Sequence, residues 1–580
     1  MSRDGANTLL NHRACPYVLV ILAALLTFGR SVGYTFLDWD DLLNIAENSA
    51  LKQPFLSGLV QIWSGPYAQM YIPVVYSTFL LDSIWGSGHP AVFHGVNVLV
   101  HAATSCVVYV LICEALRHVH AQKAMHDIEA DVKPSALAGA LLFALHPLQA
   151  EAVSWVTGRK DLLCGLFSVL CLYGFLRWLV RRRTVYLAVA SVSMLLALLC
   201  KPTAVMLPLL AGALALCFPD RWRASLAALL PWVMISVCWA AFSVNLQTGI
   251  GTESAILPVW KRPFLAADSI LFYVQKILLP VGLAPIYDRS VESVFTTPAI
   301  WLKLPLLIAG LAAAVLGSRI IAISCFWFVV PLLPVSGLYP FQYQSISTVA
   351  DRYGYISMLG VALAASVALV RPGRQPAHKH LYGTAIVTVL LVLACVSFRQ
   401  SGHWKNSRTL WERELAVNPA NSQALVNLAT GYAEESRWAL ATEKLLQAIR
   451  SDPEYAPAYS NLLIVASAAG RDQDVKRTAL EIIERFGTRG KTGGGSVASY
   501  IALARAYGMT GNSESAIQAY RAALHGDPEN AMTWYELALA HREAGDTSAS
   551  RHALNHALAI EPNSTMALNL ITELRLSDKK

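Results

Sequence analysis

The sequence predicts an all-α protein, in which a polytopic membrane helix bundle is followed by a soluble α-solenoid of tetratricopeptide repeats. Hydrophobic residues make up 55% of the 580 residues and charged residues only 14%, whereas soluble domains carry roughly 25% charged residues. Apolar runs fill residues 17–398, while 403–580 is polar with a helical pattern. We therefore expect a cytoplasmic N-terminus at 1–16, a multi-span domain at 17–400 and a repeat domain at 403–580.

The first apolar run, 15–28, follows Arg3, His12 and Arg13 and shows no small-residue cleavage pattern before the next acidic segment. We expect it to be an uncleaved signal anchor. All ten cysteines lie in or beside apolar segments, and no disulfide framework or metal-type pair is visible. The formal charge of +8 is modest and its basic residues sit largely in short loops, so no nucleic-acid partner is indicated.

Twelve apolar segments are candidate spans, several of them shorter than the roughly 20 residues that a bilayer requires: 17–37, 90–116, 134–147, 161–180, 184–199, 203–218, 225–244, 264–282, 298–316, 319–335, 353–370 and 381–398. Basic loops are expected to face the cytoplasm, and they lie at 117–123, 181–183, 221–223, 319 and 371–379. Alternating crossings satisfy this rule only if one segment does not cross. The weakest is 264–282, which carries Asp268 and Lys276 and is expected to be re-entrant or interfacial.

About eleven crossings then remain, with the repeat domain outside the cytoplasm. The same alternation makes four connections extracytoplasmic, 38–89, 148–160, 245–297 and 336–352, together with the corner at 200–202. These connections are where we look for chemistry.

The polar half is a repeat array. Prolines at 419, 453, 528 and 562 are separated by 34, 75 and 34 residues, and 34 is the tetratricopeptide period. The long gap holds two repeats and a Gly-rich insertion at 488–495. Four full repeats are expected, with a partial one at 404–419 and a closing helix at 563–576. Such arrays present a concave surface for polypeptide, although a repeat array that only scaffolds assembly has the same pattern.

The segment FLDWDDLLNIAEN, 36–48, places Asp38, Asp40 and Asp41 just after the first span. Solvated carboxylates at a membrane boundary are one interpretation. The other is a catalytic site, because neighbouring carboxylates resist joint ionisation and one of them can take a proton from an attacking hydroxyl. Asp38, before Trp39, is the more interfacial of the three.

The connection 146–163 is unusually rich in polar side chains, namely His146, Glu151, Arg159, Lys160 and Asp161. The basic pair would lie outside the cytoplasm, against the positive-inside bias. It predicts either recognition of an anionic group such as phosphate or a structural salt-bridge network.

A third group of polar residues lies at the outer ends of later spans: Lys201, Asp351, Arg352 and Tyr353. Lys201 fits a phosphate contact, while an aromatic belt with a snorkelling Arg is the alternative for the other three. Separately, His94, Asn97 and His101 share one helix face. Polar contacts within the bundle are the favoured role for this face, because a metal site needs more ligands.

Four stretches, FLDWDDLLNIAEN, PAVFHGVNVLVHA, HPLQAEAVSWVTGRKDLL and VADRYGYISMLG, together with the repeats, resemble the transmembrane and tetratricopeptide-repeat-containing O-mannosyltransferases, including bacterial relatives. The resemblance covers roughly residues 36–565. It implies a GT-C glycosyltransferase that moves mannose or another hexose from a polyprenyl-phosphate carrier to Ser or Thr of a protein acceptor outside the cytoplasm. The partners implied are this donor, a polypeptide acceptor bound by the repeats, and the lipid bilayer.

The resemblance assigns proton abstraction to Asp40 or Asp41 and acceptor or sugar orientation to Glu151. It assigns the carrier phosphate to Arg159, Lys201 and Arg352. Further candidates for phosphate binding are Lys160 and Tyr353, and candidates for support of the site are Asp38, His94, Asn97, His146, Asp161 and Asp351. Family members commonly have Arg where Ile72 precedes Pro73, and often an acidic residue where Pro202 follows Lys201. A divalent cation such as Mg²⁺ or Mn²⁺ is compatible with paired aspartates, and the sequence requires none.

Two other classes remain open: a lipid-linked glycan ligase or polymerase with a glycan acceptor, and a non-enzymatic membrane scaffold. Many spans with charged external loops count against the scaffold, and the repeats favour a polypeptide acceptor over a glycan. The compact loops fit a bacterial inner membrane with periplasmic repeats better than an endoplasmic reticulum membrane with lumenal repeats.

Overall fold

A computed structural model describes residues 14–119, 125–247, 257–370, 376–491, 496–562 and 564–577. In these ranges the chain forms helices and loops, with one isolated β-bridge between Tyr67 and Met70 and no strand. The predicted all-α class is confirmed. Most of the expected N-terminal segment, and parts of 117–123, 245–297, 371–379 and 488–495, lie outside the described residues.

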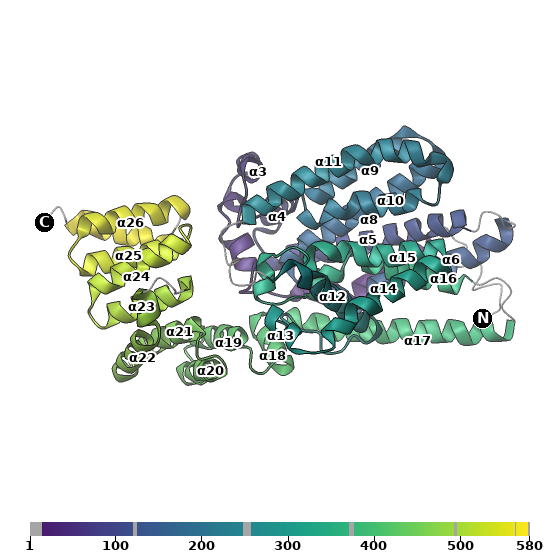
Figure 1. Ribbon diagram of the computed structural model, residues 1–580. Coiled ribbons are helices and arrows are strands. Elements are labelled where there is room, and N and C mark those ends of the chain that lie inside the picture. The colour runs from purple at the N-terminus through teal and green to yellow at the C-terminus, as the bar shows by residue number, and fades with distance from the viewer. Residues whose placement is uncertain are drawn as a thin grey trace. The chain divides into compact units, whose positions relative to one another are not determined.

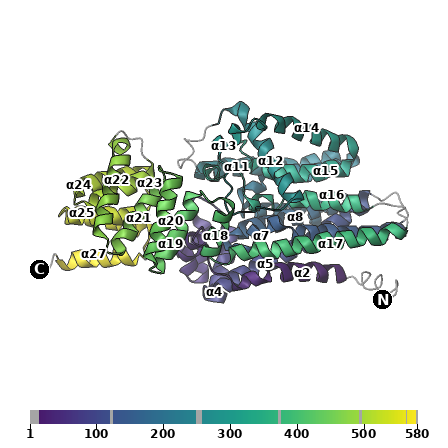
Figure 2. The same ribbon diagram turned by 90° about the horizontal axis from the view of Figure 1, so that it is seen from below.

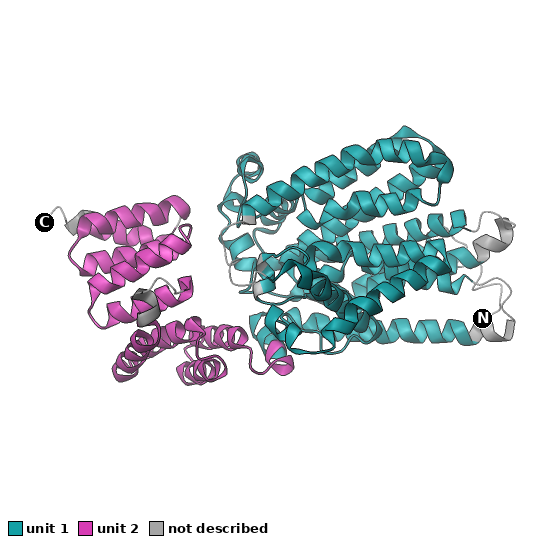
Figure 3. Ribbon diagram, in the orientation of Figure 1, with its two compact units in different colours: residues 1–413 teal, residues 414–580 magenta. Residues whose placement is uncertain are grey.

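The chain divides into two compact units, Met1–Arg413 and Glu414–Lys580 (Figure 3). The helices of the first unit (Figure 1) are α2 (Cys15–Phe28), α3 (Phe55–Ser64), α4 (Pro73–Gly86), α5 (Pro90–Val119), α6 (Met125–Leu145), α7 (Ala150–Ser154), α8 (Arg159–Arg181), α9 (Thr184–Leu198), α10 (Leu207–Ala215), α11 (Trp222–Gln247), α12 (Arg262–Leu278), α13 (Val291–Thr296), α14 (Ile300–Gly317), α15 (Arg319–Val329), α16 (Met358–Leu369), α17 (Pro376–Ser401) and α18 (Ser407–Val417), which continues past the unit boundary.

Six described helices are long and apolar enough to cross a membrane: Cys15–Gly33, Pro90–Val119, Val156–Arg181, Pro219–Leu246, Ile300–Gly317 and Leu381–Trp404. The bent pair Asp131–Leu145 and Pro147–Ser154 would make a seventh. The chain is therefore a multi-pass membrane protein. Four shorter apolar helices coincide with other predicted spans, Thr184–Leu198, Pro202–Ala215, Arg319–Val335 and Met358–Leu369. The count of about eleven crossings stays a prediction, because it depends on these shorter helices.

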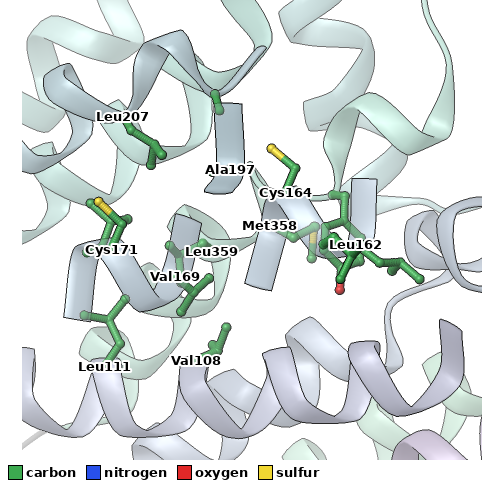
Figure 4. Close-up of a cluster of buried hydrophobic side chains, with 14 of the residues drawn as sticks. Val108, Leu111, Leu162, Cys164, Val169, Cys171, Ala197, Leu207, Met358 and Leu359 are labelled. Carbon is green, nitrogen blue, oxygen red and sulfur yellow. The ribbon is translucent and has the colours of Figure 1, made fainter. Parts of the chain in front are cut away.

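The core of the first unit lies where α5, α8, α9, α10 and α16 pack together. Val108 and Leu111 of α5 face Val169 and Cys171 of α8, with Ala197, Leu207 and Met358 closing the cluster (Figure 4). Helix α2 packs against both α5 and α17 (Figure 2). This core holds the helix ends, and hence the connections between them, in fixed positions.

Close approach of α15 and α16 depends on a glycine. A Cβ placed on Gly360 would lie 2.2 Å from the Ser324 carbonyl oxygen and 2.5 Å from the Phe328 backbone nitrogen. Small residues at such crossings let two membrane helices pack backbone against backbone.

The second unit contains four helix pairs and a closing helix, as the proline spacing predicts: α19 (Ser422–Glu434) with α20 (Trp438–Ser451), α21 (Ala456–Ala468) with α22 (Asp472–Lys491), α23 (Val497–Met509) with α24 (Ser513–Gly526), α25 (Ala531–Glu543) with α26 (Thr547–Ile560), and α27 (Thr565–Ser577). The turn inside each pair has one residue with positive φ. Gly470, Gly511 and Gly545 fill it in three pairs, and Ser436, at φ 58°, fills it in the first. Glycine suits this left-handed conformation because it has no Cβ.

Candidate functional site

Asp41 joins the first loop to the connection before α8. Its Oδ2 accepts a hydrogen bond from Leu37 N (3.0 Å), and its Oδ1 accepts from Thr157 N (3.0 Å) and Thr157 Oγ1 (2.6 Å). The side chain is fully buried. Burial raises the pKa of Asp41 to about 6, although its three hydrogen bonds oppose the shift. Asp41 is therefore a buried anchor with both oxygens occupied.

Asp40 is the accessible member of the pair. It is half-buried, and its carboxylate accepts no hydrogen bond from the part of the chain that is described. Its backbone oxygen accepts from Asn44 N (2.9 Å) and Asn44 Nδ2 (2.8 Å), and Tyr76 Oη donates to Asn44 Oδ1 (2.7 Å). The next residues, Leu42–Ala46, form a short π-helix, which is frequent at functional sites. The backbone of Asp40 is held while its carboxylate remains available.

Asp38 contacts a different part of the chain from Asp40 and Asp41. Its side chain is exposed, and its Oδ1 accepts a hydrogen bond from Trp411 Nε1 (3.1 Å). The three aspartates thus separate into a tethered Asp38, an available Asp40 and a buried Asp41.

Arg159 is completely buried. Its Nη2 donates to Asp82 Oδ2 and to the Phe93 carbonyl, both at 2.7 Å, its Nη1 donates to Thr78 Oγ1 (3.2 Å), and its Nε contacts Asn97 Oδ1. The guanidinium thereby ties α8 to α4 and α5. Arg159 therefore takes part in a buried salt-bridge network, while binding of the carrier phosphate by Arg159 stays a prediction.

Asp82 was not among the predicted residues. A single Asp inside the apolar stretch PVVYSTFLLDSIWG was a usable signal, since buried charges in such helices require partners.

Lys160 differs from Arg159, because it pairs with no carboxylate in the described residues. Its ammonium lies over the Trp155 ring, 5.3 Å from the centroid. The charged groups near it are Asp40, Asp161, Arg352 and Lys201. Lys160 therefore lies among residues that the sequence places in four separate segments.

Glu151 and Arg352 form a buried ion pair between α7 and the short helix Asp351–Gly354. The Arg352 guanidinium also lies over aromatic rings, 4.4 Å from the Tyr343 centroid and 5.0 Å from that of Tyr353. The neighbouring Asp351 accepts a hydrogen bond from Tyr287 Oη (2.6 Å). Burial and the Glu151 charge raise the pKa of Asp351 well above its ordinary value.

Lys201 forms an ion pair with Asp161 and lies over the Tyr353 ring, 5.1 Å from the centroid. The other oxygen of Asp161, Oδ2, is buried and has no hydrogen-bond partner among the described residues. Both residues line a small cavity, together with Thr203, Arg352 and Tyr353. Two cations, two phenol rings and one carboxylate therefore line the same cavity.

The three predicted histidines and Asn97 make contacts between helices and connections of the first unit. His101 Nε2 donates to the Ala144 carbonyl (3.0 Å), so its Nδ1 accepts from Tyr355 Oη (2.9 Å). His146 Nδ1 accepts from Leu148 N (3.3 Å), and its Nε2 donates to the Ile277 carbonyl (3.1 Å). His94 packs against the Tyr34 ring, and Asn97 Nδ2 donates to the Trp155 carbonyl (2.8 Å). The contacts of His146 and Asn97 hold the connection that carries Glu151 and Lys160.

No group of three or more His, Cys, Asp or Glu side chains within the described ranges is arranged to hold a metal ion. In the Asp40–Asp41 pair, both Asp41 oxygens already accept hydrogen bonds. Asp40 is the member of the pair whose carboxylate accepts no hydrogen bond in the described part of the chain.

Comparison with known proteins finds a tetratricopeptide repeat family at residues 396–456 and 501–565. The chain is 25% identical to protein O-mannosyl-transferase TMTC4 of Mus musculus, over 72% of this chain and 64% of the relative. It is 22% identical to protein O-mannosyl-transferase F38B6.6 of Caenorhabditis elegans, over 76% and 63%. It is also 22% identical to the human TMTC3 protein O-mannosyl-transferase, over 92% and 67%.

The chain thus spans a little under two thirds of the length of the first two relatives. Among solved structures, a thermophilic tetratricopeptide repeat protein of Thermus thermophilus, TTC0263, matches 32% of this chain and 95% of its own length, at 18% identity and a TM-score of 0.25.

Proposed function

Because the chain is a homologue of the tetratricopeptide-repeat-containing protein O-mannosyl-transferases, we propose that it transfers mannose or another hexose to Ser or Thr hydroxyls of a protein acceptor. The donor in this proposal is a polyprenyl-phosphate sugar, and the reaction takes place outside the cytoplasm. Residues 17–400 form the GT-C-like transferase domain, and 403–580 bind the acceptor polypeptide.

The observation that supports this proposal is the gathering of complementary chemistry from separate connections. Asp40 comes from the first loop, Glu151 and Lys160 flank the start of α8, Lys201 precedes α10, and Arg352 precedes α16. Sugar transfer from a lipid phosphate needs a base for the acceptor hydroxyl and positive charge for the leaving phosphate. Asp40 can supply the base, and the three cations can supply the charge.

In the proposed reaction Asp40 takes the proton of the acceptor hydroxyl. The resulting oxygen forms a bond to the anomeric carbon, the bond from that carbon to the phosphate oxygen breaks, and the electron pair leaves with the phosphate. The configuration at the anomeric carbon inverts because the displacement is direct. Lys201, Lys160 and Arg352 stabilise the negative charge on the departing phosphate, with the Tyr353 ring packed against two of these cations.

Other site residues have supporting roles in this proposal. Glu151 orients Arg352 through their ion pair, Asp41 holds the loop of Asp40, and Arg159 fixes α8. Asp161 holds the Lys201 ammonium through their ion pair, beside the Tyr353 ring.

The decisive experiment compares extracytoplasmic proteins from cells with and without this chain, by intact mass and glycopeptide analysis. Loss of a hexose on Ser or Thr supports the proposal. Unchanged proteins with altered surface polysaccharide indicate the glycan ligase instead, and unchanged proteins and glycans indicate the scaffold.

The role of Asp40 is tested in the purified protein with a polyprenyl-phosphate hexose and a Ser/Thr-containing peptide. Asp40→Asn should reduce turnover by roughly 10²–10⁴, the contribution typical of a general base, with little change in thermal stability. Asp220→Asn is the control, because Asp220 is exposed and pairs with Arg182 at the C-terminal end of α8, whereas Lys160 lies at the N-terminal end of that helix. Near-normal turnover in Asp40→Asn rejects the base assignment.

A further inference from the structure

Four tryptophans stack beside the acidic segment. The Trp39 ring lies 5.4 Å from that of Trp411, 5.8 Å from that of Trp155 and 6.5 Å from that of Trp404, and the Trp155 and Trp404 rings are 5.9 Å apart. Trp155, Trp404 and Trp411 are each only 1% exposed. Trp39 therefore packs against three indoles that the rest of the first unit holds in place.

The indoles belong to three different segments. Trp39 stands between Asp38 and Asp40, Trp155 lies between α7 and α8, and Trp404 and Trp411 lie in 402–413, which follows α17. Aromatic pairs in such arrangements contribute beyond their buried area. The cluster thus connects the acidic segment with the chain that leads towards the repeats.

Hydrogen bonds join the same two segments. Trp411 Nε1 donates to Asp38 Oδ1 (3.1 Å), Asp38 N donates to Ser407 Oγ (3.0 Å), and Thr35 N donates to the Lys405 carbonyl (3.1 Å). All three contacts lie on the N-terminal side of Asp40. On its C-terminal side, Asp41 and Asn44 hold the backbone. The loop of Asp40 is therefore fixed from both directions.

We propose that residues 402–413 are a working part of the transfer site, in which Trp411 and Ser407 are positioning residues that place Asp40 through Asp38 and Trp39. This inference rests on the proposed function, since positioning matters only if Asp40 acts on an acceptor. Small displacements of a base reduce the rate steeply, because the reacting atoms must lie within about 3–3.5 Å of each other. The segment before the repeats is then more than a linker.

The test uses full-length variants with the donor and peptide named above. Trp411→Phe keeps a ring but removes the N–H donor, and Asp38→Ala removes the acceptor. Each should lower kcat by about tenfold, equivalent to one hydrogen bond to a charged group, with KM for donor and peptide within about twofold. Asp38→Asn retains an Oδ1 acceptor and should restore near-normal kcat.

The double variant Trp411→Phe/Asp38→Ala should be no slower than Asp38→Ala, because both changes remove the same hydrogen bond. Trp301→Phe is the matched control: Trp301 stacks on Trp260 at 5.9 Å in another part of the first unit, and its loss should leave kcat unchanged. Unchanged kcat in Trp411→Phe and Asp38→Ala, with turnover lost in Asp40→Asn, overturns the positioning role and leaves the proposed function standing.

A second readout does not depend on turnover. Amide hydrogen exchange in peptides covering 36–48 should accelerate at least about fivefold in Trp411→Phe, because the loop loses a restraint on one side. Exchange in α12 should not change. Exchange in 36–48 equal to that of the wild type also overturns the inference, whether or not transfer is detected.

Discussion

Glu151 and Arg352 contact each other twice: Glu151 Oε1 pairs with the Arg352 guanidinium, and Glu151 Oε2 accepts a hydrogen bond from Arg352 N (2.9 Å). Both side chains are deeply buried, with 7% of Arg352 and 1% of Glu151 exposed. The pair joins α7 to the segment before α16, so two residues that are 201 positions apart link two connections.

Removing one partner of this pair should lower the free energy of unfolding substantially. Arg352→Ala leaves Glu151 buried and unpaired, and we expect a loss of about 3–5 kcal/mol of stability. Arg182→Ala is the control, because its partner Asp220 is 3.4 Å away and both side chains are mostly exposed, which limits the loss to roughly 1 kcal/mol or less. Thermal unfolding in detergent measures both. Equal losses in the two variants would contradict the buried pairing.

Asp41 should make stability depend on pH. Its pKa is raised from 3.8 to about 6 in the folded protein, so between these values the folded chain holds a proton that the unfolded chain has lost. The free energy of unfolding therefore falls by up to about 3 kcal/mol as pH rises from about 4 to about 6. Above that range the contribution of Asp41 is constant. We expect the stability difference between wild type and Asp41→Asn to follow this course in unfolding measured from pH 4 to 7. A difference independent of pH would show that Asp41 titrates normally.

Gly360 should tolerate no side chain. Gly360→Ala places a Cβ 2.2 Å from the Ser324 carbonyl oxygen, so α15 and α16 must separate, at a cost of about 1–3 kcal/mol or more. Gly310→Ala in α14 is the matched control, because a Cβ added there would meet no atom within 4 Å and alanine favours helix by about 1 kcal/mol. Melting temperatures should thus shift in opposite directions. A stable Gly360→Ala protein would mean that the two helices do not pack this closely.

Arg505 should contribute more to the stability of the repeat array than Arg542. Arg505 forms a bidentate contact with Glu536, 31 residues later (Nη2 to Oε1 2.7 Å and Nε to Oε2 3.1 Å), and its Nη1 donates to Ser460 Oγ (2.6 Å). Arg542 reaches Glu573 over the same sequence interval but at 3.5 Å, with both side chains exposed. Lysine cannot reproduce the guanidinium fork.

Arg505→Lys should therefore destabilise the array by about 1–2 kcal/mol, and Arg542→Lys should have no measurable effect. Hydrogen exchange of α23 and α25 in the full chain measures the difference. Equal protection of the amides from exchange in the two variants would contradict this expectation, because it would mean that both ion pairs contribute equally little to stability.

Composition and periodicity were enough to predict the all-α class, the membrane helices and the four repeats. These features depend on local physics: apolar length decides whether a helix suits a bilayer, and a 34-residue period determines a stacked helix pair. Even the closing helix, predicted at 563–576, is found at Thr565–Ser577. The number of crossings and the side of the membrane stay predictions, since several apolar helices are shorter than a full span.

Only the tertiary structure decided which partner each charged side chain contacts and which of these side chains are buried. Sequence placed Arg159 and Lys160 together, yet Arg159 faces Asp82 inside the bundle while the neighbouring Lys160 lies near Asp40. The sequence also groups three aspartates that differ in the structure: Asp38 accepts a hydrogen bond from Trp411, Asp40 is half-buried, and Asp41 is buried and hydrogen-bonded. Residue type and spacing cannot separate such neighbours, because a side chain's role is set by partners that are distant in the chain and meet only after the helices have packed.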